Sequence, residues 1–342
     1  MTLGRSLHGM RAIAFSYFAA AFVATFALGC SGDDEQKKPP TYGTMKPPAQ
    51  GWKAAVGDGG TLLETFDDAS WDVRKVTDHD LYAVSCIDNE VGWAVGARGF
   101  IGHTRDGGWS WPAQDSHVSA ALRAVSFAFA DDGAEMGLAV GDDATLVSTT
   151  DGGETWSRAA LPGVTGTLRG TAITEGASLL VAVGDAGLVL RSTDHGKSFT
   201  ASRIEGAADL FDVALDAQGG LGFAVDSRGG IWVSRDRALT FEREHLAAGR
   251  LESVSLGRTG ALGSAAGPGQ ALLRRSDGTW TSLPSEEPLP LHATLVGPRE
   301  DRVYFAGDTG ALLETVDDGR TLFRVPADTS ASLRGIEDLE AR

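Results

Sequence analysis

The chain has 342 residues, of which 45 are glycine, and a formal net charge of −16. This charge makes nucleic acid and anionic lipid poor partners for the body of the protein, because both are negatively charged. Frequent glycine, with aromatic residues at repeated positions, is typical of short strands joined by tight turns. A repeat that runs along the chain favours one large domain over two small ones.

Residues 1–29 have the pattern of a secretory signal. Arg5 and Arg11 precede an apolar run at 12–29 that ends in small residues, as in the n-region, h-region and cleavage site of such signals. The ending Phe-Ala-Leu-Gly-Cys-Ser resembles a bacterial lipoprotein signal, although the leucine lies two rather than three residues before Cys30. This resemblance implies cleavage after residue 29, acylation of Cys30 and a mature charge of −18, since two arginines are lost. An uncleaved membrane anchor is the alternative, because an apolar run of about 18 residues can also span a bilayer.

Residues 30–50 contain two lysine- and proline-rich stretches, Lys37–Pro40 and Lys46–Pro48. Such a composition predicts a flexible, extended tether without a core. We therefore expect an exported protein held in the bacterial cell envelope by a lipid on Cys30, on the periplasmic side or the cell surface, with the outer membrane favoured. Cys86, the other cysteine, lies in an apolar strand pattern and is expected to be a packed core thiol.

A phrase of the form Thr-x-Asp-Gly-Gly-x-Thr-Trp is the most regular feature of the chain. Its cleanest copies are Thr104–Trp111 and Thr149–Trp156. The aspartates of the seven copies are Asp67, Asp106, Asp151, Asp194, Asp236, Asp277 and Asp317. Their separations of 39, 45, 43, 42, 41 and 40 residues are typical of a propeller or array, in which no unit buries its apolar faces alone.

Four short strands are predicted in the second repeat. They are Leu81–Cys86, Gly92–Gly96, Gly99–Thr104 and a fourth strand from about Trp111, which together make one propeller blade. The same order begins again at Leu122, Leu168, Leu210, Leu251 and Leu291.

The first repeat lacks its first strand. It contains predicted strands at 53–57, 61–65 and 71–76, and the missing strand is found at the other end of the chain, at Leu333–Ile336. The sequence therefore predicts an all-β, seven-bladed β-propeller of four-stranded antiparallel blades over residues 51–342. Its C-terminal strand completes the first blade and leaves no open sheet edge.

The repeated phrase resembles the Asp-box, or BNR, motif of sialidases and many other propellers. Its aspartate can accept hydrogen bonds from its own loop, its glycines supply positive φ, and its aromatic residue can pack between sheets. The resemblance implies a role in the fold, remote from any active site. Each loop offers only one or two carboxylates, too few for a calcium cage, and the seven histidines lack metal-ligand spacing. No cofactor is expected.

A longer consensus carries a closer family resemblance. It runs from Gly-x-Ala-Val-Gly through the Asp-box and is matched by Gly92–Trp111, Gly137–Trp156 and Val181–Phe199. The chain is similar, over residues 53–339, to the photosystem II stability/assembly factor-like propellers. The resemblance implies an exported, non-enzymatic, seven-bladed protein that binds other proteins. In photosynthetic members an arginine-rich patch helps to engage an assembly client, but relatives in bacteria without photosynthesis leave the client here open.

The residue after each inner-strand leucine is predicted to line the mouth of the central channel. These positions are Tyr82, Arg123, Arg169, Phe211, Glu252, His292 and Arg334, and hairpins on the same face add Arg98 and Arg228. Arginine and tyrosine are common in interaction hot spots, so a partner-binding site is one hypothesis. The alternative is that the arginines pair with hairpin acids and hold the blades; those acids are Asp58, Asp142, Asp185 and Asp308.

The sequence favours a non-catalytic scaffold or assembly factor for an envelope complex. A sialidase-type, carbohydrate-active or glycan-binding propeller is the alternative, yet the usual Arg-Ile-Pro phrase of sialidases is absent. Of the tyrosines after the signal, Tyr42, Tyr82 and Tyr304, only Tyr82 is placed plausibly for a nucleophile. No Ser-His-Asp arrangement or phosphate loop stands out.

Overall fold

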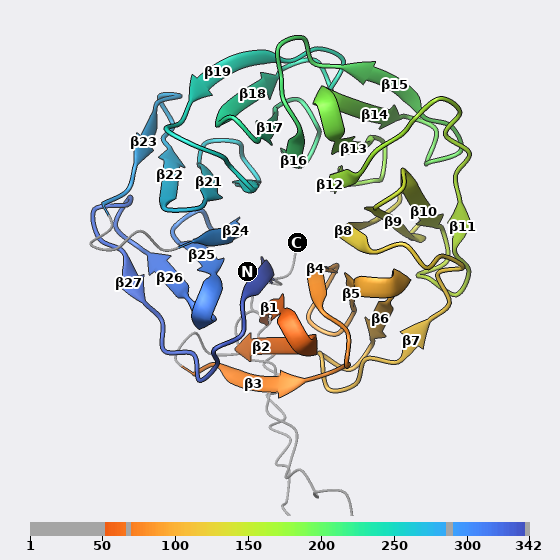
Figure 1. Cartoon of the computed structure of the whole chain (residues 1–342), viewed down its shortest axis with the longest axis horizontal. Coiled ribbons are helices and arrows are strands. Elements are labelled where there is room, and N and C mark those ends of the chain that lie inside the picture. The colour runs from red at the N-terminus through yellow and green to blue at the C-terminus, as the bar shows by residue number, and fades with distance from the viewer. Residues whose placement is uncertain (1–51, 66–69, 285–289, 339–342) are drawn as a thin grey trace, which may run out of the picture. The chain divides into compact units, whose positions relative to one another are not determined.

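The computed structural model describes residues 52–65, 70–284 and 290–338 of the chain. They form seven four-stranded antiparallel sheets, which surround a central opening as the blades of a propeller (Figure 1). The predicted seven-bladed fold is confirmed. The predicted signal at 1–29, the tether at 30–50 and Cys30 lie outside the described residues.

The strands of each blade follow one another from the channel outwards. Blade 1 holds β28 (Leu333–Asp338), β1 (Lys53–Gly57), β2 (Thr61–Thr65) and β3 (Asp72–Lys75); blade 2 holds β4 (Leu81–Cys86), β5 (Gly92–Gly96), β6 (Ile101–Thr104) and β7 (Ala113–Gln114). Blade 3 holds β8 (Leu122–Phe129), β9 (Glu135–Gly141), β10 (Thr145–Thr149) and β11 (Ser157–Arg158); blade 4 holds β12 (Leu168–Ile173), β13 (Leu180–Gly184), β14 (Leu188–Ser192) and β15 (Thr200–Arg203).

The last three blades have the same order. Blade 5 holds β16 (Leu210–Leu215), β17 (Gly222–Asp226), β18 (Gly230–Ser234) and β19 (Glu242–Leu246); blade 6 holds β20 (Ser253–Leu256), β21 (Gly263–Gly267), β22 (Gln270–Arg274) and β23 (Trp280–Ser282). Blade 7 holds β24 (Leu291–Val296), β25 (Val303–Gly307), β26 (Leu312–Thr315) and β27 (Phe323–Arg324). Short 3-10 turns join the second and third strands of four blades: η1 (Asp58–Gly60), η2 (Ala97–Gly99), η3 (Asp185–Gly187) and η4 (Asp308–Gly310). Across the part of the chain that the structure covers, no helix is long and apolar enough to cross a membrane.

The C-terminal strand β28 closes the ring as predicted. It pairs antiparallel with β1, with Lys53 opposite Asp338 and Ala55 opposite Ile336, and it is the strand of blade 1 nearest to the central opening (Figure 1). Since β28 is the only inner strand of this blade, an edge of β1 would be exposed without it.

The third and fourth strands of blade 2 begin later than the sequence predicts. β6 begins at Ile101 because residues 97–99 form the η2 turn, and β7 begins at Ala113 rather than near Trp111. Trp111 belongs to the Asp-box loop and is only 8% exposed. The pairing with β6 therefore begins at Ala113, two residues after the buried tryptophan.

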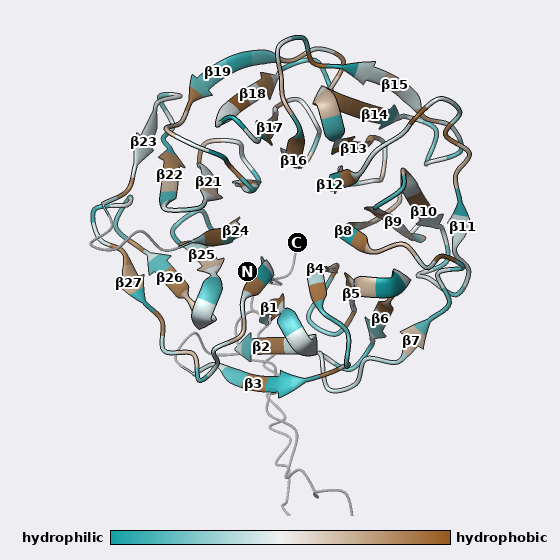
Figure 2. Ribbon diagram, in the orientation of Figure 1, coloured by the Kyte–Doolittle hydropathy of each residue, from teal (hydrophilic) through white to brown (hydrophobic). Residues whose placement is uncertain are grey.

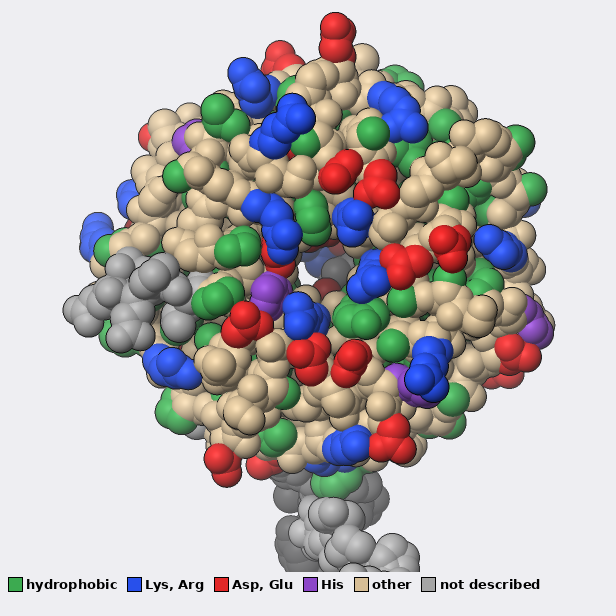
Figure 3. All heavy atoms as spheres, in the orientation of Figure 1, with side chains coloured by type: hydrophobic (Ala, Val, Ile, Leu, Met, Phe, Trp, Pro, Cys, Tyr) green, Lys and Arg blue, Asp and Glu red, His purple; other side chains and the backbone are tan. Residues whose placement is uncertain are grey.

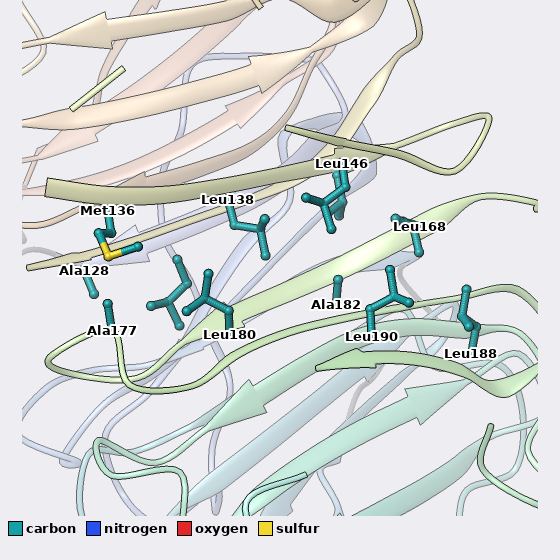
Figure 4. Close-up of a cluster of buried hydrophobic side chains, with 12 residues drawn as sticks. Ala128, Met136, Leu138, Leu146, Leu168, Ala177, Leu180, Ala182, Leu188 and Leu190 are labelled. Atoms are coloured by element: carbon teal, nitrogen blue, oxygen red, sulfur yellow. The ribbon is translucent and has the colours of Figure 1, made fainter. Parts of the chain in front are cut away.

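The core consists of seven apolar clusters, one between each pair of adjacent blades. Figure 4 shows the cluster in which Leu138 and Leu146 of blade 3 pack against Leu168, Leu180 and Leu190 of blade 4. Apolar residues concentrate on the inner and middle strands, and hydrophilic residues on turns and outer strands such as β19 (Figure 2). Each blade thus buries its faces only against its neighbours, and loss of one buried leucine side chain should cost about 2–5 kcal/mol.

Candidate functional site

The Asp-box aspartates are hydrogen-bonded within their own loops. Asp106 Oδ1 accepts from the Thr104 hydroxyl at 2.8 Å and the Ser110 amide at 2.9 Å, and its Oδ2 accepts from the Ser110 hydroxyl at 2.6 Å. The same three bonds occur at Asp151, Asp194, Asp236 and Asp317, and a shortened set occurs at Asp277. Asp67 lies outside the described residues. These bonds lower the pKa of Asp194 to about 2, and the bond from the Ser198 hydroxyl has the largest effect.

The preceding blade also binds these loops. The carbonyl of Gly152 accepts from Trp93 Nε1 at 3.2 Å and Gln114 Nε2 at 3.4 Å, both in blade 2, and the carbonyl of Arg237 accepts from Arg191 Nε at 2.7 Å. The Asp-box carboxylates thus shape loops whose carbonyls link adjacent blades. We propose a structural role for them, since their lone pairs are taken up locally.

A channel of about 330 Å³ runs through the centre, lined by residues of all the inner strands. Six inner strands begin at a buried leucine, and in blade 6 the corresponding Leu251 lies two residues before β20; in all seven cases the residue after the leucine is partly exposed and lines the channel. These lining residues are Tyr82, Arg123, Arg169, Phe211, Glu252, His292 and Arg334. Figure 3 shows basic and acidic side chains gathered around the central opening.

Arg123, Arg169 and Arg334 lie at the rim of the channel and are called the rim arginines below. A close approach of two backbone segments brings them to the hairpin acids. Gly141 ends β9 opposite Leu122, and a Cβ at Gly141 would lie 1.9 Å from the Ala121 carbonyl oxygen. Because glycine has no Cβ, the Asp142 amide reaches that carbonyl at 3.0 Å. This bond places Asp142 beside Arg123, and the repeated glycine of the sequence consensus therefore has a steric cause.

Each rim arginine forms an ion pair with a hairpin aspartate of its own blade. Arg123 donates from Nε and Nη2 to Asp142 at 3.0 and 2.8 Å, and the bond to Asp142 raises the pKa of Arg123 above its ordinary value. Arg334 donates from the same two nitrogens to Asp58, at 3.1 Å each, and Arg169 to Asp185 at 3.1 and 2.7 Å. The pairing that the sequence left as an alternative is therefore present at all three arginines.

Two aromatic rings hold the arginines from neighbouring blades. The Arg123 guanidinium carbon lies 4.8 Å from the centroid of the Tyr82 ring. Those of Arg169 and Arg250 both lie 5.0 Å from the centroid of Phe211, so this ring of blade 5 contacts a cation from blade 4 and another from blade 6. Such cation–π contacts add to the ion pairs in fixing the guanidinium groups.

Arg250 was missed by the sequence reasoning. It precedes Leu251, whereas only the residue that follows each leucine was considered. The signal that could have found it is the sequence Arg-Leu-Glu, in which the two charged residues flank a buried leucine and form an ion pair, Arg250 with Glu252.

His292 joins blade 7 to blade 6 at the same rim. Its Nδ1 lies 2.6 Å from Glu252 Oε2 and its Nε2 lies 2.8 Å from Asp308 Oδ1. When both ring nitrogens carry a proton, both donate to carboxylates. Asp308, the fourth hairpin acid, therefore also has a partner at the rim.

Arg98 and Arg228 are not brought into the channel. Both are exposed on hairpins between second and third strands, and neither lines the channel. Arg98 sits in the η2 turn with a φ of 58°. These two side chains belong to the surface around the mouth.

Asp212 lies deeper in the channel and had no role in the sequence-based predictions. Its Oδ2 accepts from the Val254 amide and the Ser253 hydroxyl of blade 6, at 3.0 Å each, and its Oδ1 accepts from the Val213 amide at 2.8 Å. Burial raises the pKa of Asp212 to about 6, against the effect of these bonds. Serines make the corresponding link between other blades, as when Ser126 Oγ accepts from the Ile173 amide at 3.1 Å.

Among the described residues, the rim carries paired charged groups and no candidate metal site. Within residues 52–65, 70–284 and 290–338, no cluster of three or more histidine, cysteine, aspartate or glutamate residues could hold a metal ion. Tyr82, the residue considered as a nucleophile, packs on a guanidinium that is itself paired with Asp142.

Comparison with known proteins gives one family and one fold. The sequence model described as "Photosynthesis system II assembly factor YCF48" matches residues 64–334, whereas no curated protein sequence matches the chain. The solved structure of YCF48 bound to a D1 peptide has a TM-score of 0.58 and 22% identity, over 80% of this chain and 84% of that one. That of YCF48 from Cyanidioschyzon merolae has a TM-score of 0.59 and 17% identity, over 82% and 90%. These two likenesses show the shared fold.

Proposed function

The chain belongs to the YCF48 family of photosystem II assembly factors, and we propose that it is an exported, membrane-tethered, non-catalytic propeller that binds a protein during assembly or stabilisation of an envelope complex. The binding surface is the rim of the channel together with the hairpins around it. It comprises Tyr82, Arg98, Arg123, Arg169, Arg228, His292 and Arg334.

The rim of arginine and aromatic residues is the observation that carries this proposal. Arg123, Arg169 and Arg334 are each held by an aspartate, yet their side chains remain 37%, 28% and 35% exposed. Arginine and aromatic side chains that are both ordered and accessible are typical of interaction hot spots. A family relative was solved with a D1 peptide, which supports a protein partner for this chain.

The described part of the propeller begins on the Asp-box face. Lys53 is the first residue of β1 and pairs with Thr65, at the end of blade 1 that leads into the Asp-box loop; Gly57, at the other end of β1, pairs with Thr61 beside η1. The segment that precedes Lys53 therefore joins the propeller on the Asp-box face.

Affinity capture of the lipid-anchored protein from its native envelope, followed by mass spectrometry, tests this function. A specific protein is expected with the wild-type chain and not with Arg123→Gln, Arg169→Gln and Arg334→Gln combined. Because these changes leave three aspartates unpaired, a matched variant also carries Asp142→Asn, Asp185→Asn and Asp58→Asn and should recover the melting temperature but not the partner. Full recovery of the partner by either variant would contradict the proposed surface.

Localisation and catalysis have their own tests. Cys30→Ala should move the protein from the membrane fraction to the soluble fraction. A fluorogenic sialoside and a glycan array test the carbohydrate alternative, and turnover that is lost on Tyr82→Phe would overturn the non-catalytic assignment.

A further inference from the structure

We propose that the mouth of the channel binds a carboxylate of the partner, either an acidic side chain or a C-terminus, through the unpaired edges of Arg169 and Arg334. This inference rests on the proposed protein-binding function and specifies the chemistry that its surface recognises.

The geometry of the ion pairs leaves one edge of each guanidinium open. Asp185 and Asp58 are bonded by Nε and Nη2 of Arg169 and Arg334. Within the described part of the chain, Nη1 of these two arginines has no hydrogen-bond partner. Nη1 and the second Nη2 proton form a donor edge that matches the two oxygens of a carboxylate.

Several carboxylates of the channel already accept hydrogen bonds. Asp185 Oδ1 accepts two bonds from Arg169, and its Oδ2 accepts from the Thr167 amide at 2.8 Å. Asp308 Oδ1 is bonded by His292, and both oxygens of Asp212 are bonded deeper in the channel. The hydrogen-bonding capacity left open on Arg169 and Arg334 therefore consists of donors, and its complement is an acceptor group.

The arginines are held before any ligand arrives. Asp185 and the Phe211 ring fix the Arg169 guanidinium from two sides, so less side-chain freedom is lost on binding. Because each arginine charge is balanced by a neighbouring aspartate, attraction for a carboxylate depends on direct contact rather than on a long-range field. Binding should consequently weaken less with salt than binding to an open basic patch.

Ligand-observed saturation-transfer NMR with the full, detergent-solubilised protein tests the inference. The probes are an acetylated tri-alanine peptide with a free C-terminal carboxylate, the same peptide as its C-terminal amide, and acetyl-Ala-Glu-Ala amide. Saturation transfer is expected for at least one of the two peptides that carry a carboxylate and not for the neutral amide. A signal from the free C-terminus alone identifies a chain end as the ligand, and a signal from the glutamate peptide alone identifies an acidic side chain.

Variants assign the signal to the rim. Arg169→Gln with Arg334→Gln should weaken carboxylate binding about ten-fold or more, as expected for loss of charge-assisted hydrogen bonds. Addition of Asp185→Asn and Asp58→Asn removes the unpaired acids, so that a loss of binding in this folded variant reports on the arginines. Arg158→Gln, at an exposed position of the outer strand β11 and outside the proposed surface, is the matched control and should bind as the wild type does.

Some results would overturn the inference. They are an equal signal from the neutral amide, or undiminished carboxylate binding in the arginine variants. Capture of a partner that the carboxylate peptides do not displace would also overturn it, while leaving the proposed function intact. Carboxylate binding without any captured partner would support this site and count against the proposed function.

Discussion

Lys53 Nζ and Asp338 Oδ2 form an ion pair of 3.3 Å between the first and the last strand of the propeller, with side chains only 4% and 3% exposed. The two residues are directly opposite each other in the β1–β28 pairing, so the charges meet only when the ring is closed. Removal of one partner from a buried pair leaves an uncompensated charge in the interior.

Asp338→Asn should therefore destabilise the protein by about 3 kcal/mol, because the Lys53 ammonium would remain buried without its counter-ion. Urea unfolding followed by circular dichroism measures the change. The double variant Lys53→Met with Asp338→Leu removes both charges and should recover most of the loss. An unchanged unfolding midpoint in the single variant would show that closure does not depend on this pair.

Deletion of residues 333–342 should destabilise the whole ring. The deletion removes β28 and exposes the inner edge of β1, and Leu333 and Ile336 also belong to the apolar cluster between blades 7 and 1. We expect a lower melting temperature and association into oligomers, measured by calorimetry and size-exclusion chromatography. Deletion of residues 339–342 alone, which keeps β28, is the control. Fraying of one end with an otherwise unchanged melting transition would contradict the prediction.

Asp212 should make the stability depend on pH. Its pKa in the folded protein is about 6, above the ordinary value of 3.8, so the native state binds the proton more tightly than the unfolded state. This contribution to stability is fully present below pH ~3.8 and is lost as the pH rises through ~6. Asp212→Asn should abolish a fall in unfolding free energy on the order of 2 kcal/mol between about pH 4 and about pH 7.5.

Parallel urea titrations of wild type and Asp212→Asn over this range provide the measurement. Ser126→Ala, which removes the corresponding link between blades 3 and 4, should shift stability equally at every pH. The same pH slope in wild type and Asp212→Asn would count against the raised pKa.

The Asp-box aspartates should make the protein less stable at low pH, which is the opposite of the effect of Asp212. Hydrogen bonds within the Asp-box loop, the strongest of them from Ser198, lower the pKa of Asp194 from 3.8 to about 2. The stabilising effect of the ionised Asp194 is therefore present above pH 3.8 and is lost as the pH falls through about 2. Asp194→Asn should lower the melting temperature at neutral pH, and the difference from wild type should vanish near pH ~2. Asp328→Asn, at an exposed position, is the control, and a difference that persists in acid would refute the assignment.

Much of the fold could be predicted from the sequence because each strand order is repeated. Lys53–Gly57 and Leu81–Cys86 were predicted with the bounds that the structure shows, since alternation of apolar residues and Asp-Gly turns act over a few residues. The outer strands were predicted less well. Their starts depend on where the Asp-box tryptophan is buried between two blades, which no single repeat encodes.

In the candidate site, the positions of the residues could be predicted from the sequence, but most of their partners could not. Strand alternation and antiparallel order place the residue after each inner-strand leucine at the channel, and all seven such residues line it. Spacing alone left open whether Arg123 pairs with Asp142, and it did not point to Arg250 or Asp212.

The sequence by itself determined the number of blades, the closing strand and which positions face the channel, because these follow from local patterns repeated along the chain. Only the tertiary structure decided the partners of those positions. Arg334 meets Asp58 across 276 residues, and Arg250 meets Phe211 from the next blade. The first contact exists only once the ring has closed, and the second only once blades 5 and 6 have packed together, because the packing of blades sets distances that local preferences leave undefined.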